Sequence, residues 1–330
     1  MERRIKERYS DAVLRAAMER YDIAASQIHL LDGFESFMYS FDRGGNAYIL
    51  RIGHSLRRSP DLIRGEVDFI NALAGGGAGV ARAVPSPRGN LVELIEDGAG
   101  EHFLATAFVR ALGRPPQSAD WTPEFVQTYG QTIGRMHAVS STYTPSNLAW
   151  QRPHWDDPIV LEIEVLLPPS ESIVIERHRE LQQHLATLPR DRDYCLIHQD
   201  AHGGNFFVDD NGRFTFFDFD DCCYGWTAYD IAMVLFYAAS GQPDPDAFAA
   251  QFMPDFLRGY TREYPFDPAW LAELPHFLKL REIDLYAVIH RSFDLDNISD
   301  PWAARFMRGR KERIEQGAPY LIVDPLALLP

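Results

Sequence analysis

The sequence predicts an α+β fold with two lobes: a small antiparallel sheet comes first, and a larger, mostly helical part follows it. Segments with strand character gather in the first third of the chain, and helical spacing dominates the remainder. A chain of 330 residues is also long enough to build two compact parts. We expect the boundary near the end of the last N-terminal strand, so that the lobes comprise residues 1–107 and 108–330.

The first lobe is expected to hold a meander of short strands and two helices. The predicted strands are apolar runs bounded by turn residues, at 28–31, 38–41, 47–52, 91–95 and 103–109. Gly33 separates the first two strands, and Gly44-Gly45-Asn46 separates the second from the third, which favours antiparallel pairing. Helical spacing predicts helices over 8–20 and 61–74, and the second of these ends at a run of glycines.

The second lobe is predicted to be helical, with one exception. The expected helices lie at 125–139, 159–166, 172–188, 228–239, 246–260, 268–286 and 301–317. The exception is a short β segment within residues 194–219, which also contains most of the polar side chains capable of catalysis.

Composition excludes several classes of partner. The formal net charge is −15, whereas a protein that binds a nucleic-acid backbone needs clustered positive charge, so we expect no nucleic-acid partner. No apolar run is long enough to span a bilayer and none follows the N-terminus, so we expect a cytoplasmic protein without a membrane partner. The three cysteines, two of them adjacent, do not predict a disulfide framework or a zinc site. The oligomeric state stays open.

Residues 195–221 contain a predicted hairpin whose open end carries two metal-ligand candidates. Asn211-Gly212 is a strong two-residue turn signal between two apolar runs. With that turn, paired positions sum to 423, so Asn205 would face Asp218. Directly opposed side chains have Cβ atoms about 5 Å apart. Amide and carboxylate oxygens suit Mg²⁺, which predicts a magnesium site at this end of the hairpin.

The spacing of polar residues around the hairpin indicates phosphoryl transfer from ATP. Asp200 lies five residues before Asn205, and the pattern His198-Gln199-Asp200 is followed later by Asp218-Phe219-Asp220. Protein kinases use this spacing in H-R-D-L-x-x-x-N and D-F-G. We therefore expect Asp200 to be the base that accepts the hydroxyl proton. His198 would act as a scaffold of the catalytic loop, and Asp220 is a further candidate metal ligand. The alternative is that these residues are ordinary turn formers.

The motif resembles the aminoglycoside phosphotransferase/choline kinase-like superfamily of small-molecule kinases, in which H-G-D-x-H-x-G-N is common. Gln199 stands where that superfamily has glycine, which leaves the local backbone conformation open. Weaker matches follow along most of the chain: Arg51, Glu66, the helix from Gly130 to His137, and Asp230. The resemblance implies a protein-kinase-like bilobal fold, with ATP bound in the first lobe and a small hydroxylated acceptor in the second.

The first lobe supplies the candidate nucleotide-binding residues. Arg51 would pair with Glu66 and touch the α- and β-phosphates. The alternative is an arginine at the end of a strand that is simply exposed to solvent. Gly33 and Ser36 lie in a loop that could cover the phosphates, or be an ordinary loop. The resemblance implies that the backbone near Phe108 and Val109 binds adenine. The alternative is an ordinary apolar strand end, which would have the same sequence pattern.

Three other functions remain open from the residues alone. A dinuclear metal hydrolase could use the cluster His198, Asp200, His202, Asp218 and Asp220. A regulator could bind nucleotide without turnover. A protein serine/threonine kinase of the same fold is the third. Against the last, the next predicted helix starts only ten residues after Asp218, and no Ala-Pro-Glu element occurs, which favours a small acceptor.

Overall fold

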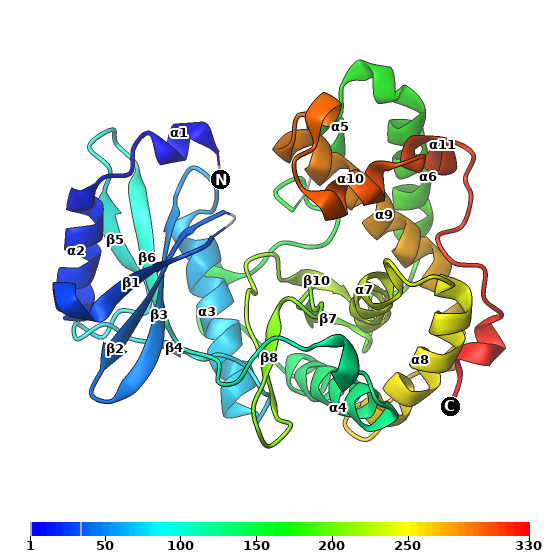
Figure 1. Ribbon diagram of the computed structural model, residues 1–330, viewed down its shortest axis with the longest axis horizontal. Coiled ribbons are helices and arrows are strands. Elements are labelled where there is room, and N and C mark those ends of the chain that lie inside the picture. The colour runs from blue at the N-terminus through cyan, green and yellow to red at the C-terminus, as the bar shows by residue number, and fades with distance from the viewer. Residues whose placement is uncertain (1, 34, 161) are drawn as a thin grey trace. The chain divides into compact units, whose positions relative to one another are not determined.

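The computed structural model describes residues 2–33, 35–160 and 162–330, and the chain divides into two compact units (Figure 1). The first unit gathers three stretches: Met1–Pro115, Thr142–Arg152 and Phe206–Asp220. The second unit gathers the others: Pro116–Ser141, Pro153–Asn205 and Asp221–Pro330. An antiparallel sheet in the first unit and helices in the second confirm the predicted α+β class. The binding roles assigned to lobes 1–107 and 108–330 stay predictions.

The first unit is built on one antiparallel sheet, ordered β1-β2-β3-β6-β4, with β5 also paired to β6. Its strands are β1 (Ile28–Leu31), β2 (Phe37–Arg43), β3 (Asn46–His54), β4 (Ala83–Val84), β5 (Glu93–Glu96) and β6 (His102–Val109). Gly44 and Gly45 have φ of 60° and 79°, as a two-residue turn between β2 and β3 requires, and this confirms the predicted meander. The two-residue strand β4 is too short to show a sequence pattern.

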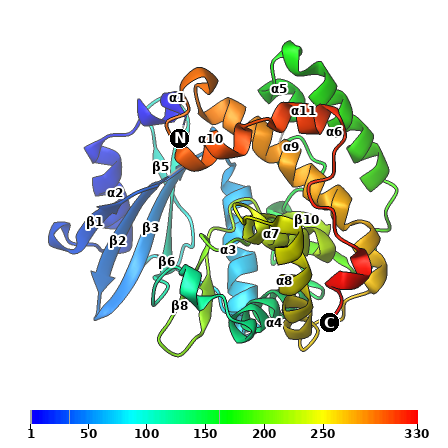
Figure 2. The ribbon, with the colours of Figure 1, turned by 45° about the vertical axis from the view of Figure 1, so that its right-hand side comes forward.

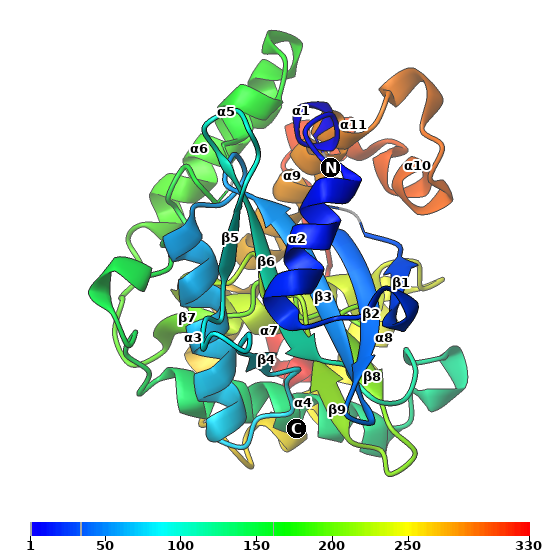
Figure 3. The same ribbon diagram turned by 90° about the vertical axis from the view of Figure 1, so that its left-hand side faces the viewer.

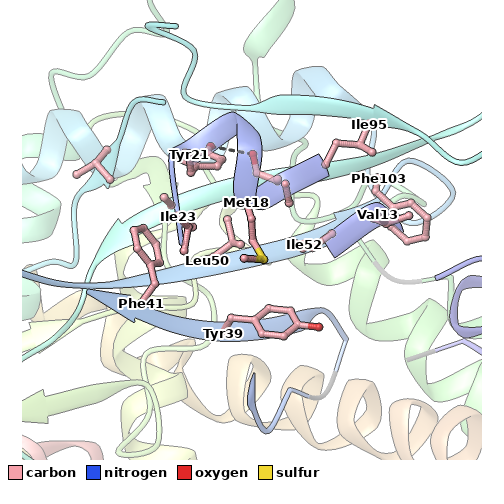
Figure 4. Packing of buried hydrophobic residues seen from close by; sticks show 14 of the residues in the cluster. Val13, Met18, Tyr21, Ile23, Tyr39, Phe41, Leu50, Ile52, Ile95 and Phe103 are labelled. Atoms are coloured by element: carbon pink, nitrogen blue, oxygen red, sulfur yellow. Dashed lines mark hydrogen bonds between the residues drawn. The ribbon is translucent and has the colours of Figure 1, made fainter. Parts of the chain in front are cut away.

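A helix covers each face of this sheet. The helix α2 (Asp11–Tyr21) buries Val13, Met18 and Tyr21 against one face, and Figures 3 and 4 show α2 across the strands and this packing. The helix α3 (Pro60–Gly75) buries Ile63 and Val67 against other side chains of the sheet. A short helix, α1 (Arg3–Lys6), precedes α2.

The two-residue period of β3 assigns its side chains to these helices. Leu50 and Ile52 are fully buried in the cluster with α2. Because successive strand residues point to opposite faces, Arg51 between them points to the face covered by α3. This is the face from which α3 presents Glu66, so the strand period decides the partner of Arg51.

The hairpin of β8 (Phe206–Val208) and β9 (Phe214–Phe216) has a register different from the predicted one. Val208 pairs with Phe214 and Phe206 with Phe216, so paired positions sum to 422 rather than 423. The prediction that Asn205 directly faces Asp218 is therefore wrong.

The cause is a three-residue loop in place of the expected two-residue turn. The N–H of Gly212 donates to the carbonyl oxygen of Asp209 at 2.9 Å, and Gly212 then takes φ of 74°. The Asp209 carboxylate accepts the N–H groups of Asn211 and Arg213, at 2.8 and 3.0 Å. A type I turn followed by a left-handed residue is the usual three-residue hairpin loop, and it shifts the register by one.

The second unit contains a two-stranded sheet and most of the helices. The strands are β7 (Tyr194–Ile197) and β10 (Cys223–Trp226), which pair antiparallel. The helices are α4 (Pro123–Ser140), α5 (Ile163–Leu166), α6 (Ser172–Leu185), α7 (Thr227–Ala239), α8 (Pro245–Tyr260), α9 (Leu274–Ser292), α10 (Pro301–Met307) and α11 (Arg310–Glu315).

Three predicted helices differ from the structure, and strand β10 was not predicted. The helix expected over 159–166 is confined to α5, and Leu161 lies outside the described residues. The helix expected over 301–317 is divided into α10 and α11 by Gly309, which has φ of 63°. Proline in the segment 268–286 produces a 3₁₀ turn, Pro268–Ala272, before α9 begins.

Helices α4 and α8 approach closely, as Figure 2 shows, because glycines line their contact. A Cβ atom on Gly130 would overlap the backbone oxygen of Phe256, and one on Gly259 would overlap that of Gln127. The glycine of the predicted Gly130–His137 motif is thus required by helix packing. Helix α4 also presents two buried side chains: the Tyr129 hydroxyl donates to the carbonyl oxygen of Ala201 in the loop that follows β7, and His137 contacts Asp230 on α7.

Candidate active site

The loop after β7 holds the predicted catalytic residues in an unusual backbone conformation. Gln199 has φ of 67°, in the left-handed region that favours glycine. Asp230, in the first turn of α7, accepts the backbone N–H groups of His198 and Gln199 at 3.0 and 2.8 Å. These two buried hydrogen bonds stabilise the turn, so the loop keeps a glycine-type conformation although glutamine stands there.

The Asp230 carboxylate is itself held in place. It lies 3.1 Å from Nε2 of His137, whose Nδ1 lies 2.7 Å from the Tyr260 hydroxyl. Burial alone would raise the pKa of Asp230, but the hydrogen bond and charge of His137 keep that pKa below its usual value. An ionised carboxylate with two backbone donors is the group on which the loop depends.

We expect Asp230→Ala to destabilise the protein by about 2–5 kcal/mol, because each buried N–H left without an acceptor costs about 1–3 kcal/mol. Urea unfolding followed by circular dichroism measures this change. The half-exposed Asp61 on α3 offers a matched control, and Asp61→Ala should cost less than about 1 kcal/mol. Equal losses for the two variants would contradict the role of Asp230.

The Asp200 carboxylate has hydrogen-bond donors at both oxygens. Arg281 Nη2 donates to Oδ1 at 2.5 Å, and Asn205 Nδ2 donates to Oδ2 at 3.0 Å. His202 Nε2 lies 3.4 Å from Oδ2. Burial would raise the pKa of Asp200, but the charge of Arg281 and the contact with His202 hold it well below its usual range. Asp200 is therefore an ionised carboxylate whose side chain is 21% exposed, and its role as the base stays a prediction.

His198 is buried, and two hydrogen bonds connect it to α7 and to its own loop. Its backbone N–H is bound by Asp230, and its Nδ1 accepts the backbone N–H of Asp200 at 3.3 Å. These contacts support the scaffold role, which stays a prediction. Tyr129 on α4 adds a hydrogen bond from its hydroxyl to the carbonyl oxygen of Ala201.

In the first unit, Arg51 and Glu66 form the expected ion pair. The guanidinium donates to both carboxylate oxygens, at 2.7 and 2.6 Å, and the two residues are 8% and 0% exposed. Burial opposes the charged form of Arg51, but the charge of Glu66 raises the Arg51 pKa above its usual value. Phe108 packs its ring against this guanidinium, 5.0 Å from the ring centroid. The contact of Arg51 with phosphates stays a prediction.

The segment after β9 presents Asp218 and buries Phe219. Asp218 is exposed and has φ of 65°. A carboxylate oxygen of this kind is a ligand that suits Mg²⁺ or Ca²⁺. Asn205 belongs to the other compact unit, and its amide nitrogen is already committed to Asp200. The metal roles of both residues stay predictions.

Asp220 is engaged by arginines. Its carboxylate accepts from Arg57 and, at 3.3 Å, from Arg58, while Arg152 donates to its carbonyl oxygen at 2.6 Å. Burial would raise the pKa of Asp220, but Arg57 and Arg58 hold it well below its usual range. These contacts favour an anchoring role for Asp220, and the metal contact stays a prediction.

The predicted phosphate loop is bound by one of these arginines, Arg57. Glu35 forms an ion pair with Arg57, which bridges it to Asp220. A Cβ atom on Gly33 would overlap the carbonyl oxygen of Ser36, so this turn requires glycine. Phe34, in the middle of the loop, lies outside the described residues. A role for Gly33 and Ser36 in covering phosphates stays a prediction.

The predicted adenine-binding segment lies at the end of β6. The N–H of Val109 already donates to the carbonyl oxygen of Arg82 at 2.9 Å. A contact between Val109 and adenine would therefore use another backbone group. The assignment of Phe108 and Val109 stays a prediction.

The sequence analysis missed the arginines that bind the two aspartates of the motif. Arg57, Arg58 and Arg152 bind Asp220, and Arg281 binds Asp200. The adjacent pair Arg57-Arg58, which begins three residues after the end of β3, was a visible signal. Arg281 has none, because it lies 81 residues from its partner Asp200.

The structure gives no support to the hydrolase alternative. Within residues 2–33, 35–160 and 162–330, the group of His, Cys, Asp or Glu side chains close enough to hold a metal ion is His184, Glu273 and His276. It contains none of the residues proposed for the hydrolase cluster.

Among the helices in residues 2–33, 35–160 and 162–330, none has the length and apolar character needed to cross a bilayer.

Comparison with known proteins assigns the family. Residues 28–274 match the model of the phosphotransferase enzyme family, APH. The amicoumacin kinase of Bacillus subtilis (strain 168) is 35% identical over 326 residues, which cover 97% of this chain and 96% of that protein.

Solved structures agree. The amicoumacin kinase hAmiN, in complex with AMP-PNP, Ca²⁺ and Ami, superposes with a TM-score of 0.93 at 36% identity, over 99% of this chain and 100% of that one. A spectinomycin phosphotransferase, in complex with ADP and spectinomycin, shares the fold with a TM-score of 0.61 at 16% identity, over 93% and 98% of the two chains. The protein thus has the predicted kinase-like fold and belongs to the phosphotransferase enzyme family, within the aminoglycoside phosphotransferase/choline kinase-like superfamily.

Proposed function

We propose that this phosphotransferase moves the γ-phosphoryl group of ATP to a hydroxyl group of amicoumacin or a closely related small molecule. The observation that carries the reaction is the ionised, partly exposed Asp200 carboxylate, held by donors on both oxygens. The observation that carries the acceptor is the near full-length similarity to two amicoumacin kinases.

In this proposal each residue has a separate task. Asp200 accepts the hydroxyl proton of the acceptor, while the Asp230 contacts keep its loop in place. Arg51, oriented by Glu66, offsets phosphate charge. Asn205 and Asp218 would hold a divalent cation, which neutralises charge on the phosphates when bound.

A small acceptor is favoured over a protein substrate. Between Asp218 and α7 the chain forms β10, which pairs with β7. That leaves no long activation segment of the kind on which protein kinases dock a peptide. No observation favours the regulator without turnover, since the polar residues of the motif are all present.

The proposal predicts phosphorylated amicoumacin when the purified protein is incubated with ATP, Mg²⁺ and amicoumacin. Mass spectrometry detects the added phosphate, and a coupled ADP assay gives the rate. Spectinomycin and a serine-containing peptide serve as comparison acceptors, and EDTA should abolish turnover. Turnover of the peptide but not of amicoumacin would reject the proposed acceptor.

Asp218→Asn should lower the same activity strongly, because the proposal assigns Asp218 to the divalent cation. Asp210→Asn, in the exposed hairpin loop, is the control and should not lower it.

A further inference from the structure

Arg281 on α9 forms a buried contact with the proposed catalytic base. Its side chain is only 14% exposed, and its Nη2 donates to Asp200 Oδ1 and to the Tyr237 hydroxyl, each at 2.5 Å. The guanidinium also lies 5.2 Å from the centroid of the Tyr237 ring. Its Nε is buried and has no hydrogen-bond partner among the residues that the structure describes. One nitrogen of Arg281 thus makes both contacts.

The surroundings of Arg281 hold it in place. Asp284, one helical turn later on α9, is buried beside Arg281, and the Tyr229 hydroxyl donates to it at 3.3 Å. Burial raises the pKa of Asp284 to about 7, so a proton can reside there while Arg281 keeps its ion pair with Asp200. Helix α9 thereby contacts Asp200 through Arg281, and it contacts Tyr229 on α7 through Asp284.

We propose that Arg281 is a positioning residue for the phosphoryl transfer, and this rests on the proposed function of Asp200 as base. Arg281 binds Oδ1 of Asp200 and fixes the rotation of the carboxylate, so that Oδ2 is presented to the hydroxyl group of the acceptor. Arg281 acts through Asp200 and does not touch the reacting atoms.

The physical reason is geometric. A carboxylate on a single Cβ–Cγ bond rotates readily, and a base that must reorient during the reaction loses the advantage of a preset position. The planar guanidinium has fixed N–H directions, whereas an ammonium group is a compact charge on a flexible stem. Arginine is therefore better suited than lysine to hold Oδ1 of Asp200, while Oδ2, which accepts from Asn205, keeps a second lone pair for the hydroxyl group of the acceptor.

The test measures kcat and both KM values for Arg281→Met and Arg281→Lys, each made in the wild-type and in the Asp200→Asn background. Arg281→Met should lower kcat about 10- to 100-fold with amicoumacin as acceptor and leave the KM for ATP within about twofold. Arg281→Lys should recover part of that loss. In the Asp200→Asn background, Arg281→Met should add less than about twofold, because a residue that acts through Asp200 has nothing left to position. The rate of MgATP hydrolysis without acceptor is measured for the same variants, so that the effect of Arg281→Met in the two backgrounds can also be compared with water as the nucleophile.

Two outcomes would overturn the inference: wild-type kcat in Arg281→Met, or an equal fold-loss in both backgrounds. Wild-type turnover in Asp200→Asn alone would instead reject the proposed base. Arg179→Met on α6, which removes an exposed arginine–carboxylate pair with Glu164, is the matched control and should leave kcat unchanged. If Arg281→Met does not fold, as judged by circular dichroism, Tyr237→Phe removes one hydroxyl contact of the same nitrogen and should lower kcat in the same direction.

Discussion

Asp200→Asn should lower kcat by at least about 10²-fold, the contribution of a positioned general base. The amide keeps the size of the side chain and one oxygen for Arg281, but it cannot accept a proton at neutral pH. Nucleotide affinity should be nearly unchanged, because the proposal assigns Asp200 to the acceptor. The measurement is kcat with amicoumacin, together with calorimetry of MgATP binding.

Asp191→Asn is the matched control for this variant, because Asp191 is an exposed aspartate in the same compact unit. It should keep wild-type kcat and nucleotide affinity. Near wild-type turnover in Asp200→Asn would remove Asp200 from the mechanism, whatever the acceptor.

Arg51→Met should have two large effects, one on stability and one on ATP use. Glu66 is completely buried, and removal of one partner from a buried ion pair costs about 3–5 kcal/mol. Turnover of ATP should also fall steeply, because the cation assigned to the phosphates is gone. Urea unfolding and kcat/KM for ATP separate these two quantities.

The double variant Arg51→Met/Glu66→Met distinguishes a nucleotide role from a structural one. Replacement of a buried ion pair by apolar side chains of similar size is often neutral in stability, so most of the lost stability should return. Turnover of ATP should stay low, because stability is restored without the charge. A double variant with wild-type kcat/KM for ATP would show that the pair is structural only. Arg51→Lys, which keeps a charge without the planar fork, should retain part of the activity.

Local patterns predicted most of the elements because their signals lie between near neighbours in the chain. The strands β1, β2, β3 and β6 and the helix α3 follow from apolar periodicity and glycine boundaries, and they match the structure to within a few residues. The hairpin register failed for a local reason as well: Asn211-Gly212 is equally compatible with a two-residue and a three-residue loop. Side-chain acceptance by Asp209 stabilises the three-residue loop.

The sequence by itself determined the α+β class and the family motif around Asp200. These follow from spacing within a strand, a helix or a loop, which the backbone geometry of each element converts into position. The pairing of Arg51 with Glu66 was expected from the family resemblance, and the structure confirms it. Only the tertiary structure decided that Asp230 supports the left-handed turn at Gln199, that Arg57 and Arg58 bind Asp220, and that Arg281 binds Asp200. The partners in these contacts lie from 31 to 163 residues apart. These contacts depend on how the helices and strands pack against one another, and the periodicity of a single segment does not predict that packing.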